Sequence, residues 1–170
     1  MKKIGILALG LFAGSIMAQK SVQVGDTLPS FSLKNQHGET VELSKYAGKK
    51  KVVYFYPKDD TPGCTTQACS FRDAYQDFEE LGAVVIGISA DDVASHKKFA
   101  EKYKLSFDLL ADEKNELRKL FGVPKTMGMI PGRVTYVTDA DNKVVFMFNQ
   151  MSDTKDHITK TLAFLKENKQ

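Results

Sequence analysis

The chain has 170 residues, of which 42% are hydrophobic and 26% charged, and its formal net charge is +3. This length predicts one domain with a core of ordinary size, and the charged fraction is that of a soluble globular protein. No basic patch and no run of like charges stands out, so the sequence does not indicate nucleic acid as a partner.

Residues 1–18 have the form of a secretory signal peptide. Lys2 and Lys3 precede an apolar run, and small residues follow it. The run is short for a membrane span, so we expect cleavage, after Ala18 or Ser15, and keep an uncleaved N-terminal anchor as the alternative. The prediction is an exported, periplasmic protein that makes no contact with a membrane after cleavage. Without the two lysines, the basic residues nearly balance the 21 acidic ones.

The rest of the chain alternates strands and helices. Short apolar or alternating runs bounded by Gly, Pro, Asn and Asp predict the strands. We expect strands at residues 31–33, 41–43, 52–56, 83–89, 107–110, 133–138 and 144–148. Apolar residues at spacings of three and four predict the helices. We expect helices at residues 64–81, 93–103, 117–121 and 158–165, with a single turn at 44–47 and Asp112 as the cap of the third helix.

This order of elements predicts an α/β fold with a central mixed β-sheet flanked by helices on both faces, and with an N-terminal β-hairpin. In such sheets the functional site lies beyond the carboxyl ends of the parallel strands. Pro57 ends the strand at 52–56 and leads toward the first cysteine, so its position fits a site. Residues 122–132 are a loop rich in Gly and Pro, for which no regular structure is predicted.

The first cysteine lies where a helix begins. Thr61 and Pro62 have the form of a helix start, with Thr61 as the hydroxyl cap, so Cys64 falls in the first turn. Unpaired backbone N–H groups and the helix dipole favour a thiolate there, which would make Cys64 a good nucleophile. Asp59 and Asp60 would oppose this if they pointed inward, so we expect both to face solvent.

The second cysteine lies on the same predicted helix. Two cysteines in an exported chain usually form a structural disulfide. Cys69 follows Cys64 by five positions, however, so on ideal helix geometry the two α-carbons are about 8.7 Å apart. A disulfide needs about 4.4 to 6.8 Å between them, so an intact helix cannot hold the bond. Either the pair never bonds, or bonding requires the helix to unwind locally, as in a redox pair that works through a conformational change.

The stretch around the cysteines resembles the peroxiredoxins, which are thiol peroxidases with a thioredoxin-like fold. It carries their Pro-x-x-x-Thr-x-x-Cys signature as Pro57, Thr61 and Cys64, within F-Y-P-K-D-D-T-P-G-C-T-T-Q-A-C-S-F-R-D. The longer run is similar to the subgroup called peroxiredoxin Q or bacterioferritin comigratory protein. The similarity continues through V-I-G-I-S-A-D, S-H-K-K-F-A-E-K-Y, F-D-L-L-A-D-E, P-G-R-V-T-Y-V-T-D and H-I-T-K-T-L-A-F-L-K. It implies one thioredoxin-like domain over residues 19–170.

The resemblance implies a role for each matched residue. Cys64 matches the peroxidatic cysteine, which attacks the peroxide O–O bond and becomes a sulfenic acid. Thr61 matches the residue whose hydroxyl orients the peroxide, and Pro57 matches the residue that shields the thiolate. Arg133 matches the arginine whose guanidinium stabilises the thiolate and the charge that develops during O–O cleavage. Cys69 matches the resolving cysteine, which forms an intramolecular disulfide.

The resemblance also implies substrates and partners. It predicts an antioxidant peroxidase that reduces hydrogen peroxide and organic hydroperoxides without metal, haem or flavin, and that thioredoxin or a similar dithiol protein re-reduces. Subgroup members are often monomers, so we expect a monomer. A disulfide oxidoreductase of similar fold is disfavoured because such proteins use Cys-x-x-Cys, whereas four residues separate the thiols here. A non-catalytic binding or redox-sensing domain is the rival from another class.

The histidines and two loop methionines are weaker candidates. His37, His96 and His157 lie on a turn and two predicted helices, so we expect neither a metal site nor a general base from them. Met127 and Met129 lie in the Gly- and Pro-rich loop, where we expect them to line an apolar rim rather than to bind copper.

Overall fold

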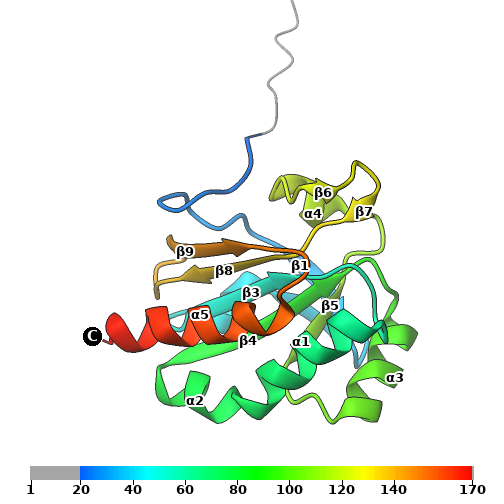
Figure 1. The fold of residues 1–170 in the computed structure, drawn as a ribbon, viewed down its shortest axis with the longest axis horizontal. Helices are drawn as coiled ribbons and strands as arrows, with labels where there is room; N and C mark the ends of the chain where they lie inside the picture. Colours follow the sequence, from blue (N-terminus) through cyan, green and yellow to red (C-terminus); the bar gives the residue numbers. More distant parts are fainter. Residues whose placement is uncertain (1–19, 170) are drawn as a thin grey trace, which may run out of the picture.

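The computed structural model describes residues 20–169, so the predicted leader and its cleavage sites lie outside the described part. Within these residues a seven-stranded sheet has the order β2-β1-β5-β4-β3-β8-β9 (Figure 1). The strands are β1 (Ser32–Asn35), β2 (Thr40–Glu42), β3 (Lys50–Phe55), β4 (Ala83–Ser89), β5 (Asp108–Ala111), β8 (Val134–Thr138) and β9 (Val144–Asn149). Because β3, β4 and β5 run parallel while the other pairs are antiparallel, the predicted mixed sheet and N-terminal hairpin are confirmed.

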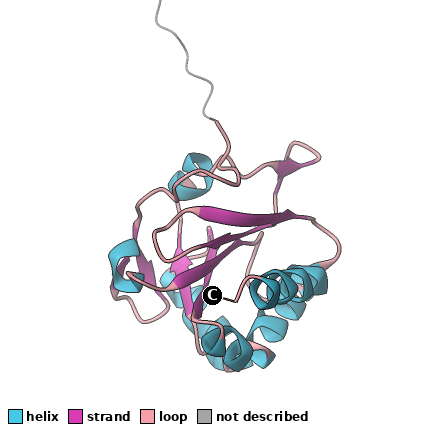
Figure 2. Ribbon diagram, turned by 90° about the vertical axis from the view of Figure 1, so that its left-hand side faces the viewer, coloured by secondary structure: helices cyan, strands magenta, loops and turns pink. Residues whose placement is uncertain are grey.

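Helices lie on both faces of the sheet, as Figure 2 shows. They are the 3-10 turn η1 (Leu43–Tyr46) and the helices α1 (Pro62–Asp73), α2 (Tyr75–Glu80), α3 (Val93–Tyr103), α4 (Glu116–Leu120) and α5 (Thr154–Glu167). Alternate side chains of β3 enter two cores. Val52 and Tyr54 pack with α1, α2, α3 and α5, whereas Val53 and Phe55 pack with α4, η1 and the N-terminal segment. A strand buried on both faces explains why this run is apolar throughout.

The predicted helix over residues 64–81 is divided in two. Ala74 leaves helical geometry at φ −96° and ψ 7°, although its N–H still donates to the carbonyl of Ser70 at 3.2 Å. Phe71 and Phe78 still pack in one core, with 5.7 Å between ring centroids. The apolar spacing therefore continues across the break and gave no sign of it.

The loop at residues 122–132 contains a short ribbon in which β6 (Lys125–Thr126) pairs with β7 (Ile130–Pro131). Met127 and Gly128 both have positive φ, 52° and 73°, which is the geometry of a type I′ turn. A methionine is rare at such a position, so the hairpin has no sequence signal. At Gly132 a Cβ atom would lie 2.0 Å from the carbonyl oxygen of Pro124, so only glycine fits there.

One edge of the sheet gathers the ends of several strands. The carboxyl ends of the parallel strands β3, β4 and β5 meet there, and Pro57, Asp91 and Asp112 follow them. Strand β8 is antiparallel to β3 with Val134 opposite Phe55, which brings the preceding residue to the same edge. The expected position of a functional site is thus formed by four strands.

No helix within residues 20–169 is long and apolar enough to cross a membrane.

Candidate active site

Cys64 is buried at the start of α1. It is the third residue of this helix and only 2% exposed. Thr61 stands before the helix with extended backbone, and its carbonyl accepts the N–H of Thr65 at 2.8 Å. The first N–H groups of a helix have no intrahelical partners and carry the positive end of its dipole. The predicted placement of the thiol in the first helical turn is therefore found in the structure.

Arg133 reaches the same sulfur from the other side of the site. Its Nη2 donates to the Sγ atom of Cys64 at 3.3 Å, although the two residues are 69 positions apart in sequence. The guanidinium is held by two further contacts, from Nε to the carbonyl of Met151 at 3.3 Å and from Nη1 to Oε1 of Gln67. Arg133 is 3% exposed, so its permanent charge acts on the sulfur with little solvent screening.

Thr61 does not cap α1 with its hydroxyl, so that expectation is wrong. The hydroxyl donates instead to the carbonyl oxygen of Lys58 at 3.0 Å, inside the loop between β3 and α1. The carbonyl of Lys58 thus competes with the N–H groups of the helix for the Thr61 hydroxyl, because Ser and Thr side chains often bind nearby backbone groups. Pro57 begins the same loop and is half-buried. Pro57 and Thr61 thus bound the segment that leads into Cys64.

Cys69 is half-buried on α1, and its thiol and that of Cys64 are both free. The helix is continuous between them because both lie within Pro62–Asp73. In this conformation the pair is therefore held in the geometry that excludes a direct bond, with α-carbons about 8.7 Å apart on an ideal helix. The structure brings Cys64 to Arg133 and holds Cys69 apart from Cys64 on the intact helix.

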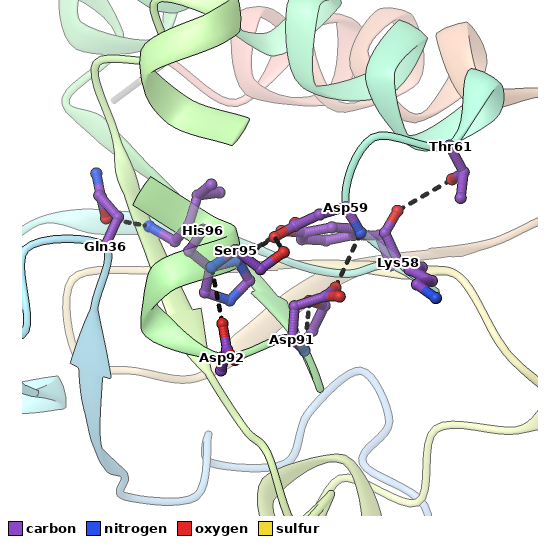
Figure 3. Close-up of polar contacts among 11 residues, drawn as sticks. Gln36, Lys58, Asp59, Thr61, Asp91, Asp92, Ser95 and His96 are labelled. Atoms are coloured by element: carbon purple, nitrogen blue, oxygen red, sulfur yellow. Dashed lines mark hydrogen bonds and ion pairs between the residues drawn. The ribbon is translucent and has the colours of Figure 1, made fainter. Parts of the chain in front are cut away.

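The expectation that Asp59 faces solvent is wrong. Asp59 is 6% exposed, and its carboxylate accepts hydrogen bonds from Tyr56 Oη at 2.6 Å, Ser95 Oγ at 2.8 Å and His96 Nδ1 at 2.8 Å (Figure 3). A carboxylate with this many donors can be buried without a large desolvation penalty. The donors on α3 are distant in sequence, so no local sequence pattern predicts them.

Asp60 faces solvent as expected. Its carboxylate binds Lys102 at 2.7 Å and accepts from Tyr103 Oη at 2.7 Å, both at the end of α3. Hydrogen bonds from Lys102 and Tyr103 hold the pKa of Asp60 below its usual range. The two neighbouring acids therefore fasten the loop to α3 in different ways, one inside the protein and one on its surface.

Two buried side chains of the site were missed by sequence reasoning. Gln67 lies on the same face of α1 as Cys64, and it accepts from Arg133. Arg118, on α4, is 6% exposed and donates to the carbonyl of Tyr56 at 2.7 Å and to that of Gly132 at 2.8 Å. These carbonyls immediately precede Pro57 and Arg133, so Arg118 ties together two segments of the site. Burial lowers the pKa of Arg118 to about 10, and the guanidinium stays charged near neutral pH.

Asp112 caps α4 as predicted, although it lies three residues before the N-cap position, which Asn115 occupies. Its carboxylate accepts from the backbone N–H of Leu117 at 3.1 Å and of Arg118 at 2.8 Å. The cap therefore also fixes the backbone of the arginine that joins the two segments.

Comparison with known proteins identifies the family. A family model described as AhpC/TSA family matches residues 24–147. The chain belongs to this family. This peroxiredoxin is 53% identical over 145 residues to the chloroplastic peroxiredoxin Q of Populus jackii, covering 85% of this chain and 68% of that one. It is 54% identical over 146 residues to the chloroplastic peroxiredoxin Q of Arabidopsis thaliana, again covering 85% and 68%.

Solved structures agree with the sequence relatives. The peroxiredoxin superimposes on the peroxidoxin BcpB of Mycobacterium tuberculosis with a TM-score of 0.77 and 37% identity, covering 85% of this chain and 96% of that one. For a cysteine mutant of Xylella fastidiosa PrxQ the TM-score is 0.82 at 30% identity, covering 89% and 99%. The predicted thioredoxin-like fold and peroxiredoxin Q subgroup are confirmed. The protein is a thiol-dependent peroxidase, an antioxidant oxidoreductase.

Proposed function

We propose that Cys64 is the peroxidatic cysteine of this peroxidase and that Arg133, Thr61 and Pro57 complete its site. The observation that carries the proposal is the hydrogen bond from Arg133 Nη2 to Cys64 Sγ, 3.3 Å long, between two side chains that are both nearly inaccessible to solvent. A fixed cation on a buried sulfur at a helix start favours the nucleophilic form of the thiol.

The first step oxidises the sulfur. The Cys64 thiolate attacks one peroxide oxygen, so that an S–O bond forms, the O–O bond breaks, and the leaving oxygen takes a proton to give water or an alcohol. Negative charge moves from the sulfur to that oxygen, and the Arg133 guanidinium lies where it can stabilise both. The Thr61 hydroxyl gives its hydrogen to Lys58, so its lone pairs are free to accept the O–H of the peroxide.

The second step forms the disulfide. The Cys69 thiol attacks the Cys64 sulfenic acid, an S–S bond forms, and water leaves. Because α1 holds the two cysteines too far apart, its first turns must unwind before the bond can form. A thioredoxin-like dithiol protein then reduces the disulfide by thiol–disulfide exchange and is itself oxidised.

The same proposal covers location and assembly. The form of residues 1–18 supports export to the periplasm, with cleavage leaving residues 19–170 as a monomeric domain that has no contact with a membrane. The plant relatives are named as chloroplastic, which agrees with a targeted protein without specifying the compartment. The mass and N-terminus of the protein recovered from a periplasmic fraction test this part.

Stopped-flow measurement of peroxide consumption tests the roles of the cysteines. We expect Cys64→Ser to lose turnover, and Cys69→Ser to keep a fast first turnover and then stop. The expected disulfide can be read from the mass of the oxidised protein, which falls only in the parent. The proposal is wrong if Cys64→Ser consumes peroxide as fast as the parent.

A further inference from the structure

A buried polar network lies behind the loop that carries Thr61. It joins three parts of the chain, which are the loop after β3, the loop after β4 and the first turns of α3 (Figure 3). Asp59 is its centre, with donors on α3 and on Tyr56. Burial raises the pKa of Tyr56, so its phenol stays protonated and donates to this carboxylate.

The His96 ring shows that the network is built around Asp59. Nδ1 lies 2.8 Å from the Asp59 carboxylate, while Nε2 is buried and has no partner within the described residues. A protonated Nε2 would be a buried donor without an acceptor, which is costly, whereas an unprotonated nitrogen loses much less. The contacts therefore place a proton on Nδ1, which donates to Asp59.

The backbone of the loop is held from the opposite side. The N–H of Asp59 donates to Oδ2 of Asp91 at 2.9 Å, and the hydroxyl of Ser89 donates to the same oxygen at 2.6 Å. Ser89 is the last residue of β4, the strand next to β3 in the sheet, and Asp91 lies two residues after it. The orientation of this N–H is thus set by the frame of the sheet.

This N–H shares a peptide group with the carbonyl that receives Thr61. The group joins Lys58 and Asp59, so its N–H points to Asp91 while its C=O accepts the Thr61 hydroxyl at 3.0 Å. A peptide group is planar, so fixing the direction of its N–H also fixes the direction of its C=O. A hydrogen bond from the N–H to a carboxylate also polarises the group and makes the carbonyl a better acceptor.

We propose that Asp91 and Asp59 are positioning residues for Thr61, because they fix the peptide group on which the Thr61 hydroxyl rests. Asp91 holds this group by accepting its N–H, and Asp59 holds it because its own side chain is bound by Ser95 and His96 on α3. The Thr61 hydroxyl therefore keeps donating its hydrogen to the Lys58 carbonyl, and its oxygen lone pairs stay directed toward the peroxide. The inference rests on the proposed role of Thr61 in orienting peroxide.

The test separates positioning of Thr61 from general support of the fold. We compare the rate at which hydrogen peroxide oxidises Cys64 with the rate at which iodoacetamide alkylates it, since alkylation needs the nucleophile but not an oriented peroxide. Asp91→Ala is expected to slow oxidation at least about tenfold, as small misplacements of catalytic groups do, and to change alkylation by less than about twofold. Asp91→Asn keeps an acceptor for the N–H and is expected to recover part of the rate.

A double variant tests whether Asp91 acts through Thr61. If it does, Asp91→Ala should add nothing once the hydroxyl is gone, so Thr61→Val with Asp91→Ala should oxidise as fast as Thr61→Val alone. Asp139→Ala is the matched control. Asp139 also accepts backbone N–H groups, those of Asp141 at 2.9 Å and Lys143 at 2.8 Å, but it lies in the turn between β8 and β9, at the opposite end of β8 from Arg133, so we expect oxidation at the rate of the parent.

The inference is overturned if the two losses add, if alkylation slows as much as oxidation, or if Asp139→Ala slows oxidation as much as Asp91→Ala. A slow Thr61→Val beside a fast Asp91→Ala overturns it and leaves the proposed function intact. A Thr61→Val variant that oxidises at the rate of the parent removes the role of Thr61, and this inference falls with it. Ser89→Ala, judged by the same criteria, replaces Asp91→Ala if that variant does not fold.

Discussion

Arg133 shows how one side chain can join several segments at the sulfur of Cys64. Its three donor nitrogens reach the carbonyl of Met151, the side-chain amide of Gln67 and the sulfur of Cys64. A planar guanidinium offers these donors in fixed directions, so each contact restrains the other two. The position of positive charge at the sulfur therefore depends on the shape of the arginine as well as on its charge.

Arg133→Lys tests whether shape matters in addition to charge. Lysine keeps the charge but has one nitrogen, which cannot reach all three partners, so the rate of Cys64 oxidation should fall about a hundredfold. Stopped-flow oxidation by hydrogen peroxide measures this rate. Arg72→Lys is the control, since Arg72 lies on the same helix as Cys64 but binds Asp73 and the carbonyl of Tyr103. Equal rates for Arg133→Lys and the parent would contradict the role of the guanidinium fork.

The residues of the motif could be predicted from the sequence, but the buried side chains that hold them in place could not. Cys64, Thr61 and Arg133 follow from a helix start and a family signature, and the structure places Cys64 and Arg133 in contact. Asp59 was misjudged because a charged residue in a polar run usually faces water. Its burial depends on hydroxyl and imidazole groups of α3, which are too distant in sequence to be recognised as its partners.

The proposed disulfide step requires a change in α1. It holds both cysteines, begins at Pro62 and packs on the sheet through Ala68 and Phe71. The segment between the cysteines includes Thr65 and Thr66, which are only half-buried and β-branched. Such residues favour helix less than alanine does, so the segment whose opening we propose has weak intrinsic helicity.

A more helical segment between the cysteines should slow disulfide formation. Replacing Thr65 and Thr66 by Ala favours the helix by roughly half a kcal/mol each, or about 1 kcal/mol together. The opened population, and with it the rate of disulfide formation, should fall about fivefold, while sulfenic acid formation stays unchanged. Quenched-flow mass spectrometry of the sulfenic acid and disulfide species separates the two steps.

A matched substitution on another helix controls for overall stability. Thr159, on α5, donates its hydroxyl to the carbonyl of Lys155 at 3.2 Å, just as Thr66 donates to Pro62 at 3.0 Å. Thr159→Ala should therefore leave the rate of disulfide formation at that of the parent. Local unwinding of α1 is not the limiting event if the double variant on α1 forms its disulfide at that rate too.

The elements themselves were largely predictable because hydrophobic periodicity decides them. The strands, the N-terminal hairpin and the helix start at Pro62 follow from local patterns. The break at Ala74 and the turn at Met127 do not, because each is set by backbone geometry at a residue type that gives no signal of it. The hairpin at residues 122–132 therefore had to be observed rather than inferred.

On the scale of the whole molecule, buried polar side chains fasten the layers around the site. Arg118 joins the loop after β3 to the segment before β8. His157 joins β8 to the segment that leads into α5. The Nδ1 atom of His157 lies 2.7 Å from the hydroxyl of Thr135, and Nε2 lies 2.7 Å from the carbonyl of Gln150. Since Met151 follows and binds Arg133, the histidine stabilises the backbone behind the arginine.

His157 should make the fold sensitive to acid. Burial lowers its pKa from the ordinary value of 6.5 to about 4, and the charge of Arg133 adds to this, while a hydrogen bond to the Gln150 carbonyl and the charge of Asp156 oppose it. The unfolded chain therefore binds this proton more readily than the folded one. The stabilisation is complete above pH 6.5 and is lost as the pH falls toward 4, by about 3 kcal/mol at most.

Denaturant unfolding at a series of pH values measures this loss, and His157→Gln removes the titrating group. The slope of the unfolding free energy between pH 6.5 and 4.5 should be clearly smaller in His157→Gln than in the parent, whatever the stability of the variant at pH 7. His37 lies exposed in the turn between β1 and β2, so His37→Gln should keep the slope of the parent. Equal slopes in all three proteins would mean that His157 takes up its proton equally well in the folded and unfolded chain, and that the sheet edge behind Arg133 tolerates a charged imidazole.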